Sequence, residues 1–336
     1  MNVTTLPTLP VPTLADGFGR RLRYVRLSIT ERCNFRCEYC LPDGCATEPG
    51  PAPLSVEEIA RLARGLAAVG VERVRLTGGE PTLRRDVSEI VRTVAATPGI
   101  AKVGLTTNGY RLDTLVPELR AAGLNMLNVS VDSLDPERFE RITGSPHLPR
   151  ILAGIEAAIE AGIGAVKVNA VLLRDLNEGE LDRFLAWTAH RPVSVRFIEL
   201  MQTGDNADFF RERHLSADTI ARGLLARGWT RVEKDPGAGP AQLYAHPDHR
   251  GQVGLIAPYS AGFCETCNRV RVSSVGSLRL CLFGGDEIPL RHFLQSDADH
   301  AGLVRAITEA VRVKPAAHDL ASGHSGTMVT LSQIGG

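Results

Sequence analysis

Three cysteines lie close together near the start of the chain, in the segment ERCNFRCEYC at residues 31–40. Cys33, Cys37 and Cys40 follow the spacing C-x3-C-x2-C. A structural zinc site closes with four ligands, so three thiolates in one loop leave such a site one ligand short. Cysteine thiolates also hold iron–sulfur clusters, and three of them could bind three corners of a cubane and leave its fourth iron open. The spacing favours a cluster, with a zinc ion completed by a distant fourth ligand as the alternative.

A second group of three cysteines lies in FCETCNRVRVSSVGSLRLCLFG, residues 263–284. Cys264, Cys267 and Cys281 follow the spacing C-x2-C-x13-C, which on its own is equally three quarters of a zinc ribbon. Two groups that each omit one ligand favour a second cluster with an open iron. Arg269 and Arg271 follow on alternate positions and so project to one side, where an anionic substrate held between the clusters would meet them.

The seventh cysteine, Cys45, belongs to neither group, and we interpret it as a free thiol on a loop. The formal net charge of zero argues against a surface that binds nucleic acid. No stretch approaches the roughly 20 apolar residues that span a bilayer, so no membrane segment is expected. Residues 1–19 have the composition of a disordered leader and not of a signal peptide. We therefore expect a cytoplasmic protein that keeps its cysteines reduced.

Strand-like and helical segments alternate along the chain, which predicts βαβ units and a parallel sheet. Six such units over residues 20–225 predict an α/β fold, an incomplete (βα)6 barrel, with a flat doubly wound sheet as the alternative. Residues 226–336 are predicted to form a C-terminal domain that carries the second cysteine group. The strand-like segments are 24–30, 73–78, 102–108, 127–133, 165–173 and 194–200.

Polar and apolar residues alternate in these segments. Strands of a parallel sheet that is covered on both faces are almost continuously apolar, so the alternation indicates that one face lines the barrel interior. Barrel interiors are usually filled by branched apolar residues. This interior is polar and cationic, which predicts a large anionic ligand. Its inward residues include Arg26, Arg75, Thr106 and Lys167.

The motif TGGEP at residues 77–81 follows the second strand, at the end where barrel enzymes place their active sites. Gly78 and Gly79 would let the backbone approach a ligand closely. Together with the first cysteine group and the aromatic residue before its last cysteine, this motif resembles the radical S-adenosylmethionine superfamily. The resemblance implies that the first three cysteines ligate a [4Fe–4S] cluster whose open iron binds S-adenosylmethionine. It also implies that the cofactor contacts Tyr39, Gly79, Ser130 and Met201.

Longer motifs resemble the GTP 3′,8-cyclase family of molybdenum cofactor biosynthesis, from about residue 20 to the end of the chain: SITERCNFRCEYCLPDG, RLTGGEPTLR, TTNGYRL, NVSVDSLD, RFIELM and CNRVR. This resemblance implies a second [4Fe–4S] cluster held by Cys264, Cys267 and Cys281. The implied catalytic residues are Cys33, Cys37, Cys40, Arg269 and Arg271. The implied GTP contacts are Arg26, Arg75, Thr106, Lys167, Arg269, Val270 and Arg271.

The same resemblance implies a lyase that converts GTP and S-adenosylmethionine to (8S)-3′,8-cyclo-7,8-dihydroguanosine 5′-triphosphate, 5′-deoxyadenosine and methionine. Its partners would be cyclic pyranopterin monophosphate synthase, which takes the product, and an electron donor such as flavodoxin or ferredoxin. A monomer or homodimer is expected. The composition of SQIGG is that of a frayed end, but family members end in a Gly-Gly tail that reaches the active site, here Gly335 and Gly336. A peptide maturase with an auxiliary cluster and a non-enzymatic zinc-binding protein are the alternatives.

Overall fold

The computed structural model describes residues 13–45, 50–234, 238–285 and 287–326. One twelve-stranded sheet runs through it in the order β12-β11-β10-β1-β2-β3-β4-β5-β6-β9-β8-β7. The strands are β1 (Tyr24–Ser28), β2 (Arg73–Thr77), β3 (Lys102–Thr107), β4 (Met126–Ser130), β5 (Ala165–Leu172), β6 (Ser194–Glu199), β7 (Thr230–Arg231), β8 (Gln242–Ala245), β9 (Gln252–Ile256), β10 (Arg269–Val272), β11 (Ser277–Arg279) and β12 (Glu287–Pro289).

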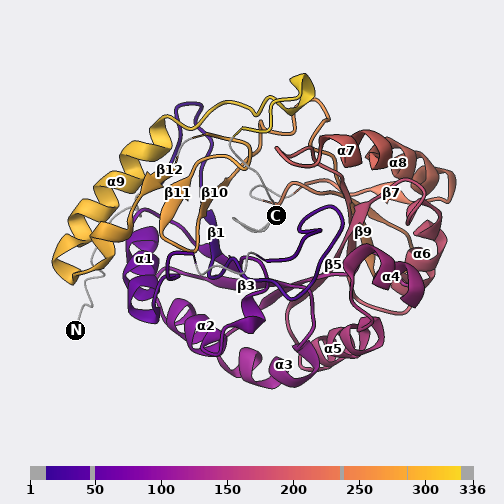
Figure 1. Ribbon diagram of the computed structural model, residues 1–336, viewed down its shortest axis with the longest axis horizontal. Helices are drawn as coiled ribbons and strands as arrows, with labels where there is room; N and C mark the ends of the chain where they lie inside the picture. The colour runs from indigo at the N-terminus through magenta and orange to yellow at the C-terminus, as the bar shows by residue number, and fades with distance from the viewer. Residues whose placement is uncertain (1–12, 46–49, 235–237, 286, 327–336) are drawn as a thin grey trace, which may run out of the picture.

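Strands β1 to β6 lie side by side in chain order, each parallel to the next, as the incomplete (βα)6 barrel predicts. The sheet is curved and open, and its helices follow the outer side (Figure 1), so the flat doubly wound alternative is wrong. The α-helices are α1 (Val56–Ala68), α2 (Val87–Ala95), α3 (Leu112–Ala121), α4 (Pro136–Thr143), α5 (Leu148–Glu160), α6 (Leu181–Ala189), α7 (Ala207–Arg213), α8 (Ala217–Ala226) and α9 (His300–Arg312).

The C-terminal part of the chain extends this sheet at both edges. Strand β10 pairs in parallel with β1, and β9 pairs in parallel with β6, so the parallel region is two strands wider than the sequence predicts. Strands β11 and β12 continue one edge in antiparallel fashion, and β8 and β7 continue the other. An open six-stranded sheet would leave two rows of unpaired backbone groups, and these added strands satisfy them.

The ordered chain begins earlier than predicted. Residues 1–12 of the predicted leader lie outside the described residues, but Leu14 is buried and its N–H donates to Val69 O at 3.0 Å. Ala15 and Arg21 form an antiparallel bridge just before β1. The disordered leader therefore does not extend to residue 19, because Leu14 belongs to the core. The predicted tail, Gly335 and Gly336, also lies outside the described residues.

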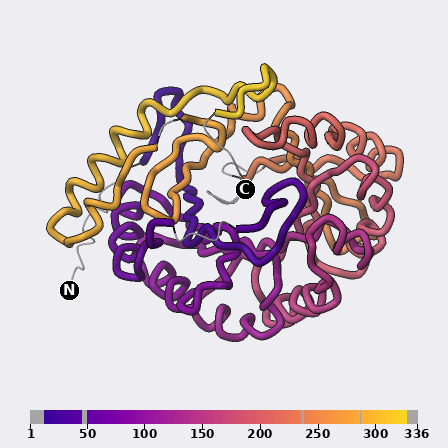
Figure 2. Tube along the Cα trace, viewed as in Figure 1, coloured from indigo at the N-terminus to yellow at the C-terminus, as the bar shows by residue number. Residues whose placement is uncertain are grey.

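Helix α9 lies beside α1, although the two helices come from opposite ends of the chain (Figure 2). A capping box starts α1, with Ser55 and Glu58 each accepting the other's backbone N–H. Glu58 also accepts hydrogen bonds from Arg291 and Gln295, which tie α1 to the segment before α9. In the described part of the chain, no helix combines the length and apolarity that crossing a bilayer requires.

Candidate active site

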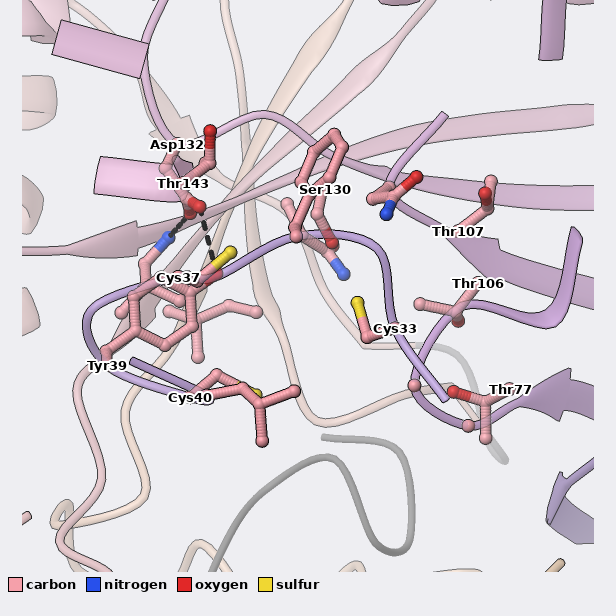
Figure 3. Close-up of a pocket in the computed structure, with 18 of the residues that line it drawn as sticks. Cys33, Cys37, Tyr39, Cys40, Thr77, Thr106, Thr107, Ser130, Asp132 and Thr143 are labelled. Carbon is pink, nitrogen blue, oxygen red and sulfur yellow. Dashed lines mark hydrogen bonds between the residues drawn. The ribbon is translucent and has the colours of Figure 1, made fainter. Parts of the chain in front are cut away.

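The first cysteine group opens onto a cavity inside the curved sheet (Figure 3). All the residues that the sequence assigns to the first cluster and to S-adenosylmethionine line this one cavity. Thr106, predicted as a substrate contact, lies here as well, together with Asp132 and Asn169. The predicted set is Cys33, Cys37, Tyr39, Cys40, Gly79, Ser130 and Met201.

The cysteine loop is fixed to the barrel by hydrogen bonds to α4 and to the end of β4. Two backbone N–H groups, of Arg36 and Glu38, donate to Thr143 O and Ile142 O, each at 3.0 Å. The Tyr39 hydroxyl donates to the Asp132 carboxylate at 2.9 Å. Asp132 is a site residue that the sequence analysis did not single out, although it follows Ser130 on the same alternating polar face.

The two glycines of TGGEP make room for the cysteine loop itself. Gly78 has a φ of +143°, and a Cβ there would lie 2.1 Å from Thr30 O. A Cβ on Gly79 would lie 2.3 Å from Arg32 O. The sequence predicts that these glycines let the backbone approach a ligand closely. In the structure they let it approach the backbone of Thr30 and Arg32.

Glu80, the acidic residue of this motif, is buried and holds the ends of β2 and β3 together. Its carboxylate accepts hydrogen bonds from Thr82 N at 2.9 Å, Thr107 Oγ1 at 2.7 Å and Asn108 N at 2.6 Å. Burial raises the pKa of Glu80, while these hydrogen bonds oppose the rise. The carboxylate thus holds Thr107 and Asn108, which line the cavity, in place.

Burial controls the protonation of the first cysteine group. It raises the pKa of the Cys33 thiol to about 11 and that of the Cys40 thiol to about 12. Negative charge adds to the effect, from Glu80 at Cys33 and from Asp132 at Cys40. The thiols of the metal-free protein therefore keep their protons at neutral pH, and metal binding must release them.

The first cavity is lined by three cysteines, the number of thiolates that a [4Fe–4S] cluster with one open iron takes. Thr106 Oγ1 and Asn169 Oδ1 are buried at the same cavity without a hydrogen-bond partner among the described residues, so a polar cofactor could satisfy them.

The second cysteine group lines a neighbouring cavity that also contains the predicted cations. Asn169, Ile198 and Met201 line both cavities, so the two adjoin. No carboxylate is among the described residues that line the second one. Its predicted residues are Arg26, Arg75, Lys167, Cys264, Cys267, Arg269, Arg271 and Cys281.

Three of these arginines form a row across adjacent strands. Arg26 is in register with Arg75 on one side and with Arg271 on the other. Like charges directly opposite each other destabilise a sheet. Burial, followed by the neighbouring guanidinium groups, lowers the pKa of Arg26 to about 9 and that of Arg271 to about 10. The cavity thus holds positive charge that an anionic ligand would neutralise.

Two of the predicted substrate contacts are placed differently. Thr106 lines the first cavity and is absent from the described lining of the second. Val270 is fully buried between its arginine neighbours and does not line the second cavity, so only its backbone could contact a ligand there.

Tyr24, Arg73 and Arg196 also line the second cavity, and the sequence analysis did not select them. Tyr24 accepts a hydrogen bond from Arg75 Nε at 2.5 Å, and Arg73 lies in register beside it on β2. Arg196 on β6 has a buried Nε without a partner in the described structure, and burial lowers its pKa to about 10. Alternation in SVRFIEL places Arg196 on the inward face, which was the available signal.

Comparisons with known proteins agree with this geometry. Residues 27–188 match the family described as the radical SAM superfamily, and residues 193–320 match the one described as Molybdenum Cofactor Synthesis C. The GTP 3′,8-cyclase of Stenotrophomonas maltophilia (strain K279a) is 53% identical over 323 residues, covering 96% of this chain and 99% of the relative. The GTP 3′,8-cyclase of Aeromonas hydrophila is 52% identical over 328 residues, covering 96% of each chain.

The chain belongs to the GTP 3′,8-cyclase family. Membership of the radical SAM superfamily makes it an enzyme that uses S-adenosylmethionine and an iron–sulfur cluster. Among solved structures it resembles Streptococcus suis SuiB bound to S-adenosylmethionine, with a TM-score of 0.58 at 14% identity, over 84% of this chain and 68% of that one. At that identity the likeness shows the shared fold only.

Proposed function

We propose that this chain is a GTP 3′,8-cyclase of molybdenum cofactor biosynthesis. It would convert GTP and S-adenosylmethionine to (8S)-3′,8-cyclo-7,8-dihydroguanosine 5′-triphosphate, 5′-deoxyadenosine and methionine. The observation that carries the proposal is a cation-lined cavity, without a lining carboxylate in the described structure, that adjoins a second cavity lined by three cysteines. The identity to named cyclases over nearly the whole chain supports it.

The first cavity would hold the [4Fe–4S] cluster on Cys33, Cys37 and Cys40, with Tyr39, Gly79, Ser130 and Met201 around S-adenosylmethionine. When bound, these cofactors would supply a 5′-deoxyadenosyl radical, formed when one electron from the reductant breaks the sulfonium bond, to take the C3′ hydrogen of GTP. Bond formation between C3′ and C8 of guanine would then take up one further electron from the reductant and one proton to give the dihydro product. The chain positions the cofactor because the Tyr39–Asp132 hydrogen bond and the two bonds to α4 fix the cysteine loop.

The second cavity would hold GTP. The guanidinium groups of Arg26, Arg75 and Arg271 can form charge-assisted hydrogen bonds with the triphosphate, and Lys167 adds a compact positive charge. Arg269 and Val270, the other proposed contacts, follow Cys267 by two and three residues. A second [4Fe–4S] cluster on Cys264, Cys267 and Cys281, with an open iron toward the guanine, is part of the proposal.

The proposed partners follow from this chemistry. The cyclised nucleotide would pass to cyclic pyranopterin monophosphate synthase, and a small electron carrier such as flavodoxin or ferredoxin would reduce the first cluster. Both clusters require reduced cysteines, which fits a cytoplasmic location. A monomer or homodimer, and a Gly335–Gly336 tail that helps organise the GTP site, complete the proposed assembly.

Metal and product analysis of protein purified without oxygen tests the proposal. We expect about eight irons per chain with little zinc, since two cubanes contain four irons each. Incubation with GTP, S-adenosylmethionine and a reductant should yield 5′-deoxyadenosine and the cyclised nucleotide. Stoichiometric zinc without iron would support the zinc-binding alternative, and cleavage of S-adenosylmethionine that responds to a peptide but not to GTP would support a maturase.

A further inference from the structure

The two cysteine groups lie in opposite electrostatic surroundings. The carboxylate of Asp132 lines the same cavity as Cys33, Cys37 and Cys40 and accepts a hydrogen bond from the Tyr39 hydroxyl at 2.9 Å. A carboxylate in the same cavity disfavours further negative charge on a group held by these cysteines.

Cations surround the second group. Arg269 and Arg271 line the same cavity as Cys264, Cys267 and Cys281. Lys314 donates a hydrogen bond to Leu280 O, beside Cys281. A group bound at the second site is therefore placed among positive charges and one bound at the first site beside a carboxylate.

Among these cations, Lys314 stands apart by its position. It is only 3% exposed and follows α9 directly. Its ammonium group donates to Leu280 O, the carbonyl next to Cys281. Its pKa falls through burial, while attraction to Cys267 and Cys281 opposes the fall. No ion pair joins it to a carboxylate within the described residues, so its charge is directed at the cysteines.

Lys314 is also separate from the substrate site. Arg269 and Arg271 line the second cavity, whereas Lys314 is absent from its described lining. Arg20, another cation near Cys264, is already paired with Asp16 at 2.6 Å. Lys314 thus lies behind the cysteines, where it can act on a cysteine-bound group without contacting a ligand in the cavity.

We propose that Lys314 is a positioning residue that sets the redox behaviour of the second cluster by stabilising its reduced form. Reduction adds one electron to a [4Fe–4S] cluster and makes it one charge more negative, and net charge around a cluster is among the factors that set its potential. This inference rests on the proposed function, which supplies the second cluster.

Lys314→Gln tests the proposal because glutamine keeps a donor for Leu280 O and removes the charge. The holoenzyme would be titrated with dithionite while electron paramagnetic resonance follows each cluster. A parallel series with Cys33, Cys37 and Cys40 replaced by Ala identifies the second cluster's signal. We expect the reduction equilibrium constant of the second cluster to fall about tenfold, which is 59 mV for a one-electron couple. The first cluster should keep its potential.

Two controls separate charge from packing. Lys314→Arg keeps the positive charge, so the potential of its second cluster should differ from that of the parent by only a small part of the shift expected for Lys314→Gln. Lys234→Gln makes the same change at an exposed lysine and should leave both potentials unchanged. Lys314→Met provides the same loss of charge if the Gln variant fails to assemble its cluster.

The outcomes distinguish this inference from the proposed function. A parent protein with only about four irons per chain would overturn the second cluster, and the role of Lys314 with it. A parent protein with two clusters, but with the same second potential in Lys314→Gln, would overturn the role of Lys314 alone. Equal shifts in the Gln and Arg variants would show that packing, and not charge, is responsible.

Discussion

Lys167 is the side chain at which the charge of the second cavity can be titrated. Burial, then Arg196 and Arg75, lower the pKa of its ammonium group to about 7. A bound triphosphate favours the charged form and raises this pKa, so binding above pH 7 takes up a proton. We predict that GTP affinity falls between about pH 7.5 and pH 9, by at most about tenfold per pH unit.

Calorimetry in buffers with different ionisation enthalpies measures this proton uptake. Lys167→Met should bind GTP more weakly and show a smaller uptake, and an uptake equal to that of the parent would assign the proton to another group. The same shift affects the stability of the ligand-free protein. The pKa of Lys167 in the folded state, about 7, lies below its ordinary value of 10.5. The unfolded state therefore binds more protons between these two pH values, and the free energy of unfolding rises with pH across that window.

Cys45 tests the assignment of the first cysteine group. Its sulfur accepts from Cys33 N–H at 2.9 Å, donates to Cys33 O at 3.2 Å, and does not line the cavity. We predict that Cys37→Ser loses the first cluster and cleavage of S-adenosylmethionine, whereas Cys45→Ser keeps most of both, because a hydroxyl can form the same hydrogen bonds. Iron content and 5′-deoxyadenosine formation are the measurements. Equal iron loss in the two variants would make Cys45 a ligand.

Sequence alternation predicts which face a residue occupies but not its height along the barrel. Arg26, Arg75 and Lys167 are predicted on the inward face and lie in the second cavity. Thr106 is on the same face, yet it is two residues beyond Gly104, the residue in register with Arg75, and so reaches the first cavity. That difference depends on strand register, which is set by contacts between distant segments.

At the scale of the strands, Gly104 on β3 leaves space for Arg75 on β2. A Cβ at Gly104 would lie 3.0 Å from the Arg75 guanidinium carbon. Arg75 donates to Tyr24 and to Leu105 O at 3.1 Å, so its head group has little freedom to move. We predict that Gly104→Ala weakens GTP binding about tenfold, roughly the value of one displaced charge-assisted hydrogen bond.

The fold should tolerate this change, since Gly104 is in a strand and has no positive φ. Thermal melting and a GTP dissociation constant, measured on the same samples, separate the two effects. Gly179→Ala is the matched control because nothing lies within 4 Å of its added methyl group. Parent-like GTP affinity in Gly104→Ala would show that Arg75 does not depend on this space.

The second cysteine group lies next to two of the proposed substrate arginines, since β10, which contains Arg269 and Arg271, begins two residues after Cys267. We predict that Cys264→Ser, by removing a ligand of the second cluster, impairs GTP binding and cyclisation. Cleavage of S-adenosylmethionine should persist in part, because the first cavity is built from the β1–β6 region. Iron content, GTP affinity and 5′-deoxyadenosine yield provide the test. Normal GTP affinity without the second cluster would remove its role in substrate binding.

The strand pairing at the edges could not be predicted from local pattern. Hydrophobic periodicity predicts six strand–helix units, but β9 and β10 come after the last of these units in the chain. They pair with β6 and β1, whose free edges exist only once the six-stranded sheet has formed. Leu14, predicted as part of a disordered leader, is buried for the same kind of reason: its hydrogen-bond partner is Val69.

At the scale of the whole molecule, the curved sheet brings the two cysteine groups to one interior. Asn169, Ile198 and Met201 separate the two cavities and line both. Buried Leu282 and Phe283 pack in an apolar cluster with Cys40, Cys281 and Met201, which connects the two cysteine groups. A cofactor in one cavity and a nucleotide in the other would therefore lie next to each other.

The central claim is that GTP in the second cavity loses its C3′ hydrogen to the adenosyl group generated in the first. GTP carrying deuterium at C3′ tests it most directly, in a single turnover with S-adenosylmethionine and reductant under anaerobic conditions. Mass spectrometry should find one deuterium in 5′-deoxyadenosine and the cyclised nucleotide in equal amount. Formation of 5′-deoxyadenosine without deuterium, or with GTP recovered unchanged, would contradict the account.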